Sequence, residues 1–293
     1  RAGVSSFGIG STNAHVILEE APPLPAGDSP RPGQLLLLSA KTPAALDAMT
    51  ANLAGYLEDR RAAGEPPELA DVAYTLQVGR QSFEHRRALV ARDLGEAIEL
   101  LRTLPPERVW THAASVSDRP VAFLLPGLGD HYPEMGLGLY RHEPVFRAEL
   151  DRCAEILRPL LGIDLCQALF PNGTGGGAQA AAKLDMRRML GRASGGDASG
   201  PLARTAVAHP ALFAVEWALA RLWQSWGVAP RALVGYSLSE YVAAALAGVF
   251  SLEDGLALVA ERAKLVDELP AGAMLAVPLP EDELAPLLAR HGL

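Results

Sequence analysis

Three features of the sequence could together carry out acyl transfer: a serine at 237, turns with free backbone N–H groups, and an arginine at 262. Ser237 follows a short apolar run, Ala232–Val234, and then Gly235, and a segment rich in Ala, Val and Leu comes after it. This order is typical of a nucleophile elbow, a sharp strand-to-helix turn that lifts one serine clear of the backbone. The G-x-S-x-G pattern would need glycine at 239, where the chain has Ser239. A small serine in an ordinary tight turn is therefore the alternative interpretation of this motif taken alone.

A second turn of the same kind lies earlier in the chain. The apolar run Val121–Leu125 predicts a buried strand of a parallel sheet, and the loop Gly127–His131 follows it. Open α/β sheets place their sites at the carboxyl ends of their strands. The turns after both strands should thus present backbone N–H groups at one sheet edge, where they could stabilise an oxyanion.

Arg262 lies on the next predicted helix, Glu253–Leu269. Its planar cation can hold a carboxylate through two hydrogen bonds. A nucleophile, oxyanion donors and a carboxylate clamp suit acyl transfer from a thioester whose acyl group carries a free acid.

Composition excludes several other classes of protein. The chain has 293 residues, of which 49% are hydrophobic and 20% charged, which is enough for two domains with a sizeable core. Its net charge of −8 argues against nucleic-acid binding, and no apolar run is long enough for a membrane-spanning helix. Cys153 and Cys166 lack metal-ligand spacing, so we expect buried thiols, no metal site and a reducing cytoplasm.

The elements before residue 119 predict a small α/β unit after a Pro/Gly-rich linker at 22–33. A buried strand is expected at Gln34–Ser39, which contains four consecutive leucines, and a second strand at Arg86–Ala91. Helices are expected at Ala45–Glu58, Glu68–Gln77 and Leu94–Leu101, the first capped by Thr42. Arg80, Arg86 and Arg87 could bind an acidic ligand, but solvated or ion-paired arginines are the simpler interpretation.

The elements after residue 119, besides those already named, are mainly helical. Helices are predicted over Glu134–Leu161, Leu184–Leu190, Pro210–Trp226 and Pro280–Arg290, and a strand over Ala273–Val277. The 172–205 segment around the second helix is rich in Gly, Ala and Ser, which is typical of a surface loop.

Four motifs of this half resemble the acyltransferase domain of modular type I polyketide synthases, which is related to malonyl-CoA:acyl-carrier-protein transacylases. Phe123–His131 is similar to the family's F-x-F-P-G-x-G-x-Q, and His209–Ala220 to its Q-P-A-L-F-A-V-E-x-A-L-A. Gly235–Ala244 is similar to G-H-S-x-G-E-Y-V-A-A, and Arg262 matches the arginine of R-x-[KR]-L/F.

The resemblance implies a domain order. Residues 1–22, in which a short strand is expected at His15–Leu18, resemble the end of a ketosynthase, usually G-T-N-A-H-V-I-L-E-E-A-P. His15 is expected to be structural. Residues 23–118 would be the α+β linker domain between ketosynthase and acyltransferase. Residues 119–270 would be the first part of a hydrolase-like α/β domain with a parallel sheet, and 271–293 the start of a ferredoxin-like subdomain.

The resemblance also implies roles for individual residues. Ser237 would be acylated, the backbone N–H groups of Leu128 and Leu238 would form the oxyanion hole, and Arg262 would hold the carboxylate of a malonyl-type group. Leu238, where glutamine is the alternative, favours malonyl over methylmalonyl. The other positions expected near the pocket depart from the family pattern and leave the extender unit open: Tyr236, Ser239, His131 and His209.

The family's general-base histidine comes well after the serine, beyond Leu293, and His291 is too early to match it. We therefore expect a chain cut within the acyltransferase, with little transfer activity by itself. The expected substrate is a malonyl-type CoA thioester, with no bound cofactor. The expected partners are the phosphopantetheine of an acyl carrier protein and the ketosynthase of the same, homodimeric, synthase.

Two alternatives remain open. One is a structural module that positions neighbouring domains or docks a carrier protein, favoured by Tyr236 and Ser239. The other is a plain serine hydrolase, against which Arg262 and the four separate motifs argue.

Overall fold

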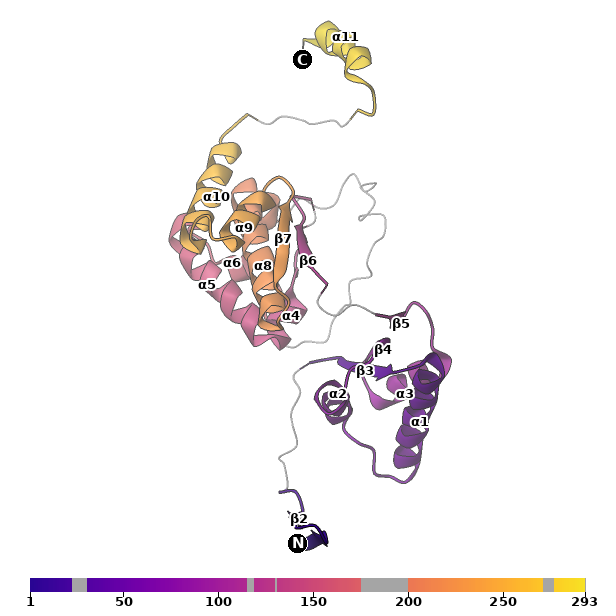
Figure 1. The fold of residues 1–293 in the computed structure, drawn as a ribbon. Helices are drawn as coiled ribbons and strands as arrows, with labels where there is room; N and C mark the ends of the chain where they lie inside the picture. Colours follow the sequence, from indigo (N-terminus) through magenta and orange to yellow (C-terminus); the bar gives the residue numbers. More distant parts are fainter. Residues whose placement is uncertain (23–30, 115–118, 130, 175–199, 271–276, 293) are drawn as a thin grey trace. The chain divides into compact units, whose positions relative to one another are not determined.

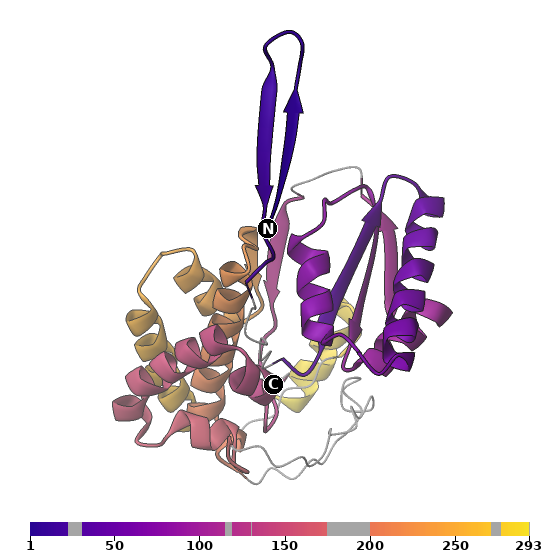
Figure 2. The same ribbon diagram turned by 90° about the horizontal axis from the view of Figure 1, so that it is seen from below.

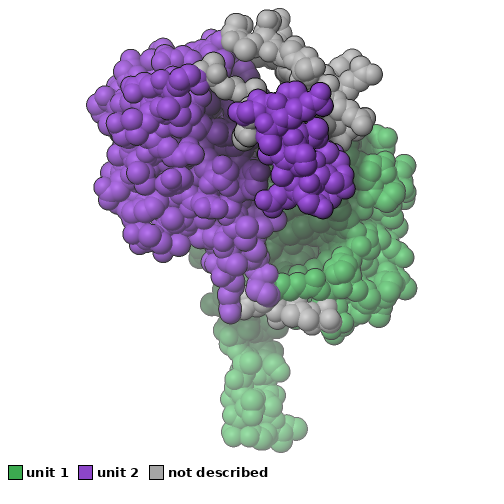
Figure 3. All heavy atoms as spheres, turned by 90° about the horizontal axis from the view of Figure 1, so that it is seen from above, with its two compact units in different colours: residues 1–119 green, residues 120–293 purple. Residues whose placement is uncertain are grey.

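The computed structural model (Figure 1) describes residues 1–22, 31–114, 119–129, 131–174, 200–270 and 277–292. The chain forms two compact units, Arg1–Arg119 and Pro120–Leu293, which Figure 3 colours separately. In the part of the chain that is described, no helix is long and apolar enough to cross a membrane. The helix expected at 184–190, and the strand expected at 273–277 except for its last residue, lie outside the described residues.

The first unit begins with an exposed antiparallel hairpin of β1 (Ala2–Phe7) and β2 (Asn13–Leu18), drawn along its length in Figure 2. Only the second strand was expected from the sequence. Ser5 and His15 face each other across the hairpin, with 2.7 Å between Ser5 Oγ and His15 Nδ1. His15 is therefore engaged within the hairpin itself.

The rest of this unit is a three-stranded antiparallel sheet with helices on one face. The strands, in the order β3-β4-β5, are β3 (Gln34–Ala40), β4 (His85–Ala91) and β5 (Val109–Ala113). The helices are α1 (Pro43–Ala62), α2 (Leu69–Val78) and α3 (Leu94–Thr103). The five elements expected here are confirmed, and so is the cap, since Thr42 Oγ1 accepts a hydrogen bond from Ala45 N at 3.2 Å. Strand β5 was not predicted.

The leucine run of β3 is buried on one side only. Leu36 and Leu38 are 0% and 2% exposed, whereas Leu35 and Leu37 are 41% and 39% exposed. The expected burial therefore holds for one face of the strand only, because α1, α2 and α3 share a single core with that face of the sheet.

Arg87 is an internal structural residue of this unit. It is buried on β4, and its guanidinium donates to Asp47 Oδ1 at 2.9 Å, Thr50 Oγ1 at 2.6 Å and Thr111 Oγ1 at 3.0 Å. These bonds tie α1 to two strands, as the ion-paired interpretation predicts.

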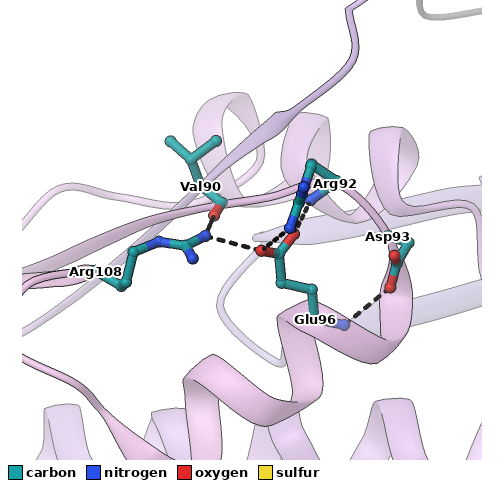
Figure 4. Close-up of polar contacts among 5 residues, drawn as sticks. All are labelled: Val90, Arg92, Asp93, Glu96 and Arg108. Atoms are coloured by element: carbon teal, nitrogen blue, oxygen red, sulfur yellow. Dashed lines mark hydrogen bonds and ion pairs between the residues drawn. The ribbon is translucent and has the colours of Figure 1, made fainter. Parts of the chain in front are cut away.

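A capped ion cluster starts α3 (Figure 4). Asp93 Oδ1 accepts from Glu96 N at 2.9 Å, and Glu96 in turn accepts from Arg92 and from Arg108. The hydrogen bonds from Arg92 and Arg108 lower the pKa of Glu96 to about 2. The cluster fastens the start of the helix to the loop before β5.

The second unit contains two parallel strands, β6 (Val121–Leu125) and β7 (Pro230–Gly235), as predicted. The strands are not buried on both faces. Leu125 is 8% exposed, but the adjacent pair Leu124 and Val234 are 74% and 54% exposed. One face is thus apolar and open in the described structure, while α9 lies against both strands (Figure 1).

Seven α-helices of this unit are described: α4 (Leu137–His142), α5 (Pro144–Leu161), α6 (Leu165–Leu169), α8 (Thr205–Ser225), α9 (Ser239–Leu246), α10 (Leu252–Asp267) and α11 (Glu281–His291). The helix predicted over 134–161 is broken, because Glu143, which precedes a proline, is extended. Helix α8 starts before the predicted Pro210, since its first turn is buried and packing offsets the missing N–H.

Helices α5, α8 and α10 surround the core of this unit. Cys153 is fully buried there, as expected, whereas Cys166 is only partly buried. Burial raises the pKa of both, that of Cys166 to about 11.

Candidate active site

Ser237 lies at the tip of the turn between β7 and α9. Its side chain is exposed and its φ is 56°, a left-handed conformation that is uncommon for a residue with a Cβ. Gly235 makes this turn sterically feasible, because a Cβ there would lie 2.4 Å from Glu240 N, a backbone atom that cannot move aside. The backbone therefore has the strained form of a nucleophile elbow.

The turn after β6 lies against this elbow. Leu125 is paired with Gly235 in the parallel register, and Tyr236 N donates to Leu125 O at 3.0 Å. At Gly127 a Cβ would lie 2.7 Å from Tyr236 Cδ1 and 2.9 Å from Tyr236 O. The glycine thus permits the close approach of the two turns. Leu128, 40% exposed, follows directly.

Several backbone N–H groups at these turns have no acceptor among the described residues, and those of Leu128 and Leu238 are among them. The N–H groups of Ser239, Glu240 and Tyr241 donate to carbonyl oxygens three residues earlier, within the start of α9. The N–H groups of Leu128 and Leu238 donate to no acceptor among the described residues. These are the same two donors that the family resemblance assigns to an oxyanion hole.

Ser239 does not line an exposed surface. Its side chain is fully buried, and its hydroxyl is hydrogen-bonded to the carbonyl oxygen of Pro126 and to Glu216 Oε1, the latter at 2.9 Å. It therefore connects the elbow to the turn after β6 and to α8. Tyr236, by contrast, is 73% exposed.

Arg262, on α10, is half-buried and meets His209 of α8. Arg262 Nη1 lies 3.3 Å from His209 Nδ1, and His209 is 4% exposed. No carboxylate among the described residues forms an ion pair with Arg262. Its charge is thus not neutralised by the part of the chain that is described.

His131 belongs to the same group. Its Nδ1 is buried and has no hydrogen-bond partner among the described residues, and it is near enough to influence His209 electrostatically. Burial, helped by the charge of Arg262 and by His131, lowers the pKa of His209 to about 4. His209 is therefore neutral near pH 7.

No described side chain forms a hydrogen bond with Ser237 Oγ. His291 lies on α11, which follows α10 only after residues 271–276. In the described residues, no group of three His, Cys, Asp or Glu side chains is arranged to hold a metal ion.

Sequence reasoning missed Glu216. It is 6% exposed on α8, and it supplies the carboxylate beside Ser239. A signal was present in the sequence: Glu216 is the one charged residue in the otherwise apolar stretch 210–220. A charge on the buried side of a helix requires a polar partner.

Comparison with protein families gives two matches. Residues 122–289 match the family described as acyl transferase domain. Residues 34–101 match the family described as CurL-like, PKS C-terminal.

Individual relatives agree with these matches. The chain is 41% identical to a phenolphthiocerol/phthiocerol polyketide synthase protein of Mycobacterium tuberculosis, over 98% of this chain and 18% of the relative. It is 40% identical to the spectinabilin polyketide synthase system protein NorA' of Streptomyces orinoci, over 99% of this chain and 8% of the relative. The chain thus spans less than a fifth of these relatives.

Solved structures of similar fold include the acyl transferase domain of ZmaA, with a TM-score of 0.73 and 40% identity, over 89% of this chain and 55% of that one. The acyl transferase domain of SpnD, solved in complex with 2-(pent-4-yn-1-yl)malonyl, has a TM-score of 0.61 and 35% identity, over 89% of this chain and 63% of that one.

Proposed function

Because the chain belongs to the acyl transferase domain family, with polyketide synthases as its relatives, we propose that it transfers a malonyl-type extender unit from CoA to an acyl carrier protein through an ester on Ser237. The observation that carries the proposal is the strained, exposed Ser237 beside a second turn with a free backbone N–H.

In the first half-reaction, Ser237 Oγ attacks the thioester carbonyl carbon and its proton leaves with the CoA sulfur. The carbonyl oxygen becomes an oxyanion, which the N–H groups of Leu128 and Leu238 stabilise by hydrogen bonds. The C–S bond then breaks, and CoA leaves as the thiol.

In the second half-reaction, the phosphopantetheine thiol of the carrier protein attacks the ester carbon. The C–O bond to Ser237 breaks, and the serine regains a proton. The same two N–H groups serve this step, since the oxyanion forms at the same position.

Arg262 selects the acyl group. A guanidinium without a carboxylate partner in the described structure suits the free acid of a malonyl-type substrate. The related domain of SpnD binds a substituted malonyl group, which supports the same substrate class for this chain. By the same family relation, we place β6 and β7 in a hydrolase-like parallel sheet, α11 at the start of a ferredoxin-like subdomain, and a ketosynthase in the same homodimeric synthase.

The test is covalent loading of the intact acyltransferase domain, measured as its mass after incubation with malonyl-CoA, methylmalonyl-CoA or acetyl-CoA. We expect a malonyl adduct that Ser237→Ala abolishes and Arg262→Ala strongly reduces. An acetyl adduct without a malonyl adduct would contradict the role of Arg262.

The second candidate is a structural module that docks a carrier protein without catalysis. It is favoured by one observation, the lack of a described hydrogen-bond partner for Ser237 Oγ. A chain that binds a carrier protein, but neither binds nor is acylated by any acyl-CoA, would support it over the enzyme.

A further inference from the structure

We propose that His209 is a positioning residue for Arg262: it accepts a hydrogen bond from one edge of the guanidinium and so turns the opposite edge toward the acyl carboxylate. The inference deepens the proposed function and rests on it.

The direction of the hydrogen bond follows from the chemistry of arginine. A guanidinium has five N–H donors and no acceptor, so at the 3.3 Å contact His209 Nδ1 must accept from Arg262 Nη1. His209 is then the neutral imidazole with its proton on Nε2. Burial favours the same neutral form.

The charged groups facing His209 are consistent with this arrangement. Arg262 and Asp267 approach from α10, and His131 from the loop after β6. Asp267 is paired with Arg204 at 3.5 Å. Asp267, which lies on the same helix as Arg262, is therefore paired with Arg204, and the guanidinium of Arg262 remains available to another anion.

The contact leaves part of the guanidinium unused. Nη1 is committed to His209, whereas Nε and Nη2 have no hydrogen-bond partner among the described residues. These two atoms form one edge of the fork, which is the geometry that holds a carboxylate through two hydrogen bonds. A general-base role for His209 does not fit, because its accepting nitrogen is already occupied by Arg262.

The experiment measures acyl preference by binding, which needs no turnover. In a Ser237→Ala background, malonyl-CoA and acetyl-CoA are titrated by calorimetry, and the ratio of their dissociation constants is compared among His209, His209→Gln and His209→Leu. His142→Leu, a change on α4 of the same unit, is the matched control.

We expect the background protein and the control to prefer malonyl-CoA by about tenfold or more, as two charge-assisted hydrogen bonds would give. His209→Gln should keep most of this preference, since its Oε1 can accept from Arg262. His209→Leu should bring the ratio to within about threefold of unity without weakening acetyl-CoA binding.

Three results bear differently on the two proposals. An undiminished preference in His209→Leu would overturn the positioning role, and so would equal losses in the Gln and Leu variants, which would indicate packing alone. Absence of any malonyl preference in the background protein would instead count against the proposed function.

Discussion

Ser239 Oγ lies 2.9 Å from Glu216 Oε1, and both side chains are buried. The same hydroxyl is hydrogen-bonded to the carbonyl oxygen of Pro126. A residue that departs from the family's glycine thus joins three elements of the candidate site: the turn after β6, α8 and the start of α9.

Ser239→Ala should therefore destabilise the second unit by about 1–3 kcal/mol, because it removes the single hydroxyl that lies between two buried acceptors, the Pro126 carbonyl oxygen and Glu216 Oε1. Urea unfolding measures the change. Ser225→Ala is a matched control, since that hydroxyl bonds a single carbonyl oxygen, of Leu222, at 2.7 Å. Ser225→Ala should lower the free energy of unfolding by less than Ser239→Ala does. Equal losses would contradict a stabilising role for the Ser239 hydroxyl beyond that of an ordinary serine.

Gly235→Ala should disrupt the elbow. The added Cβ would meet backbone atoms of Glu240 at 2.4–2.5 Å, which requires a shift of α9 and should cost about 1–3 kcal/mol or more. The thermal unfolding temperature and the affinity for acyl-CoA should both fall. Gly138→Ala, where a Cβ meets nothing within 4 Å, is the control and should leave both unchanged or slightly improved.

Ser237→Gly should be more stable than Ser237→Ala by about 1 kcal/mol, because glycine tolerates the φ of 56° without the penalty of a Cβ. Both variants should lose acyl loading. At Ser225, the last residue of α8, the order should reverse, with glycine less stable than alanine. Equal stability of the two Ser237 variants would mean that the turn carries no strain.

His209 should make stability depend on pH. Its pKa is lowered to about 4 in the folded chain by burial and by Arg262, against about 6.5 when unfolded. Unfolding therefore takes up a proton between these values. The contribution of neutral His209 to the free energy of unfolding is therefore fully present above about pH 6.5, and it is lost as the pH falls toward 4.

His209→Gln should remove this dependence. Urea unfolding of both proteins between about pH 4.5 and 7.5 should give curves whose slopes differ by up to about 1.4 kcal/mol per pH unit, the value for one proton. Parallel curves would show that His209 titrates normally in the folded state.

The sequence by itself determined most of the secondary structure and the location of the elbow. The strands β6 and β7, and helices such as α3 and α10, follow from local periodicity and capping, which act between residues close in the chain. The glycine and serine spacing of 235–239 identified the turn, since a nucleophile elbow is a local backbone form.

The tertiary structure alone decided which side chains meet. The exposure of Leu35 and Leu37, the burial of Ser239 and the contact of His209 with Arg262 all depend on segments distant in sequence, here up to 113 residues for Ser239 and Pro126. Burial and hydrogen bonding between such segments follow from packing. A local sequence pattern does not specify packing between distant segments. For this reason Ser239 is only a departure from the motif in the sequence, whereas the structure shows its hydroxyl buried against Pro126 and Glu216.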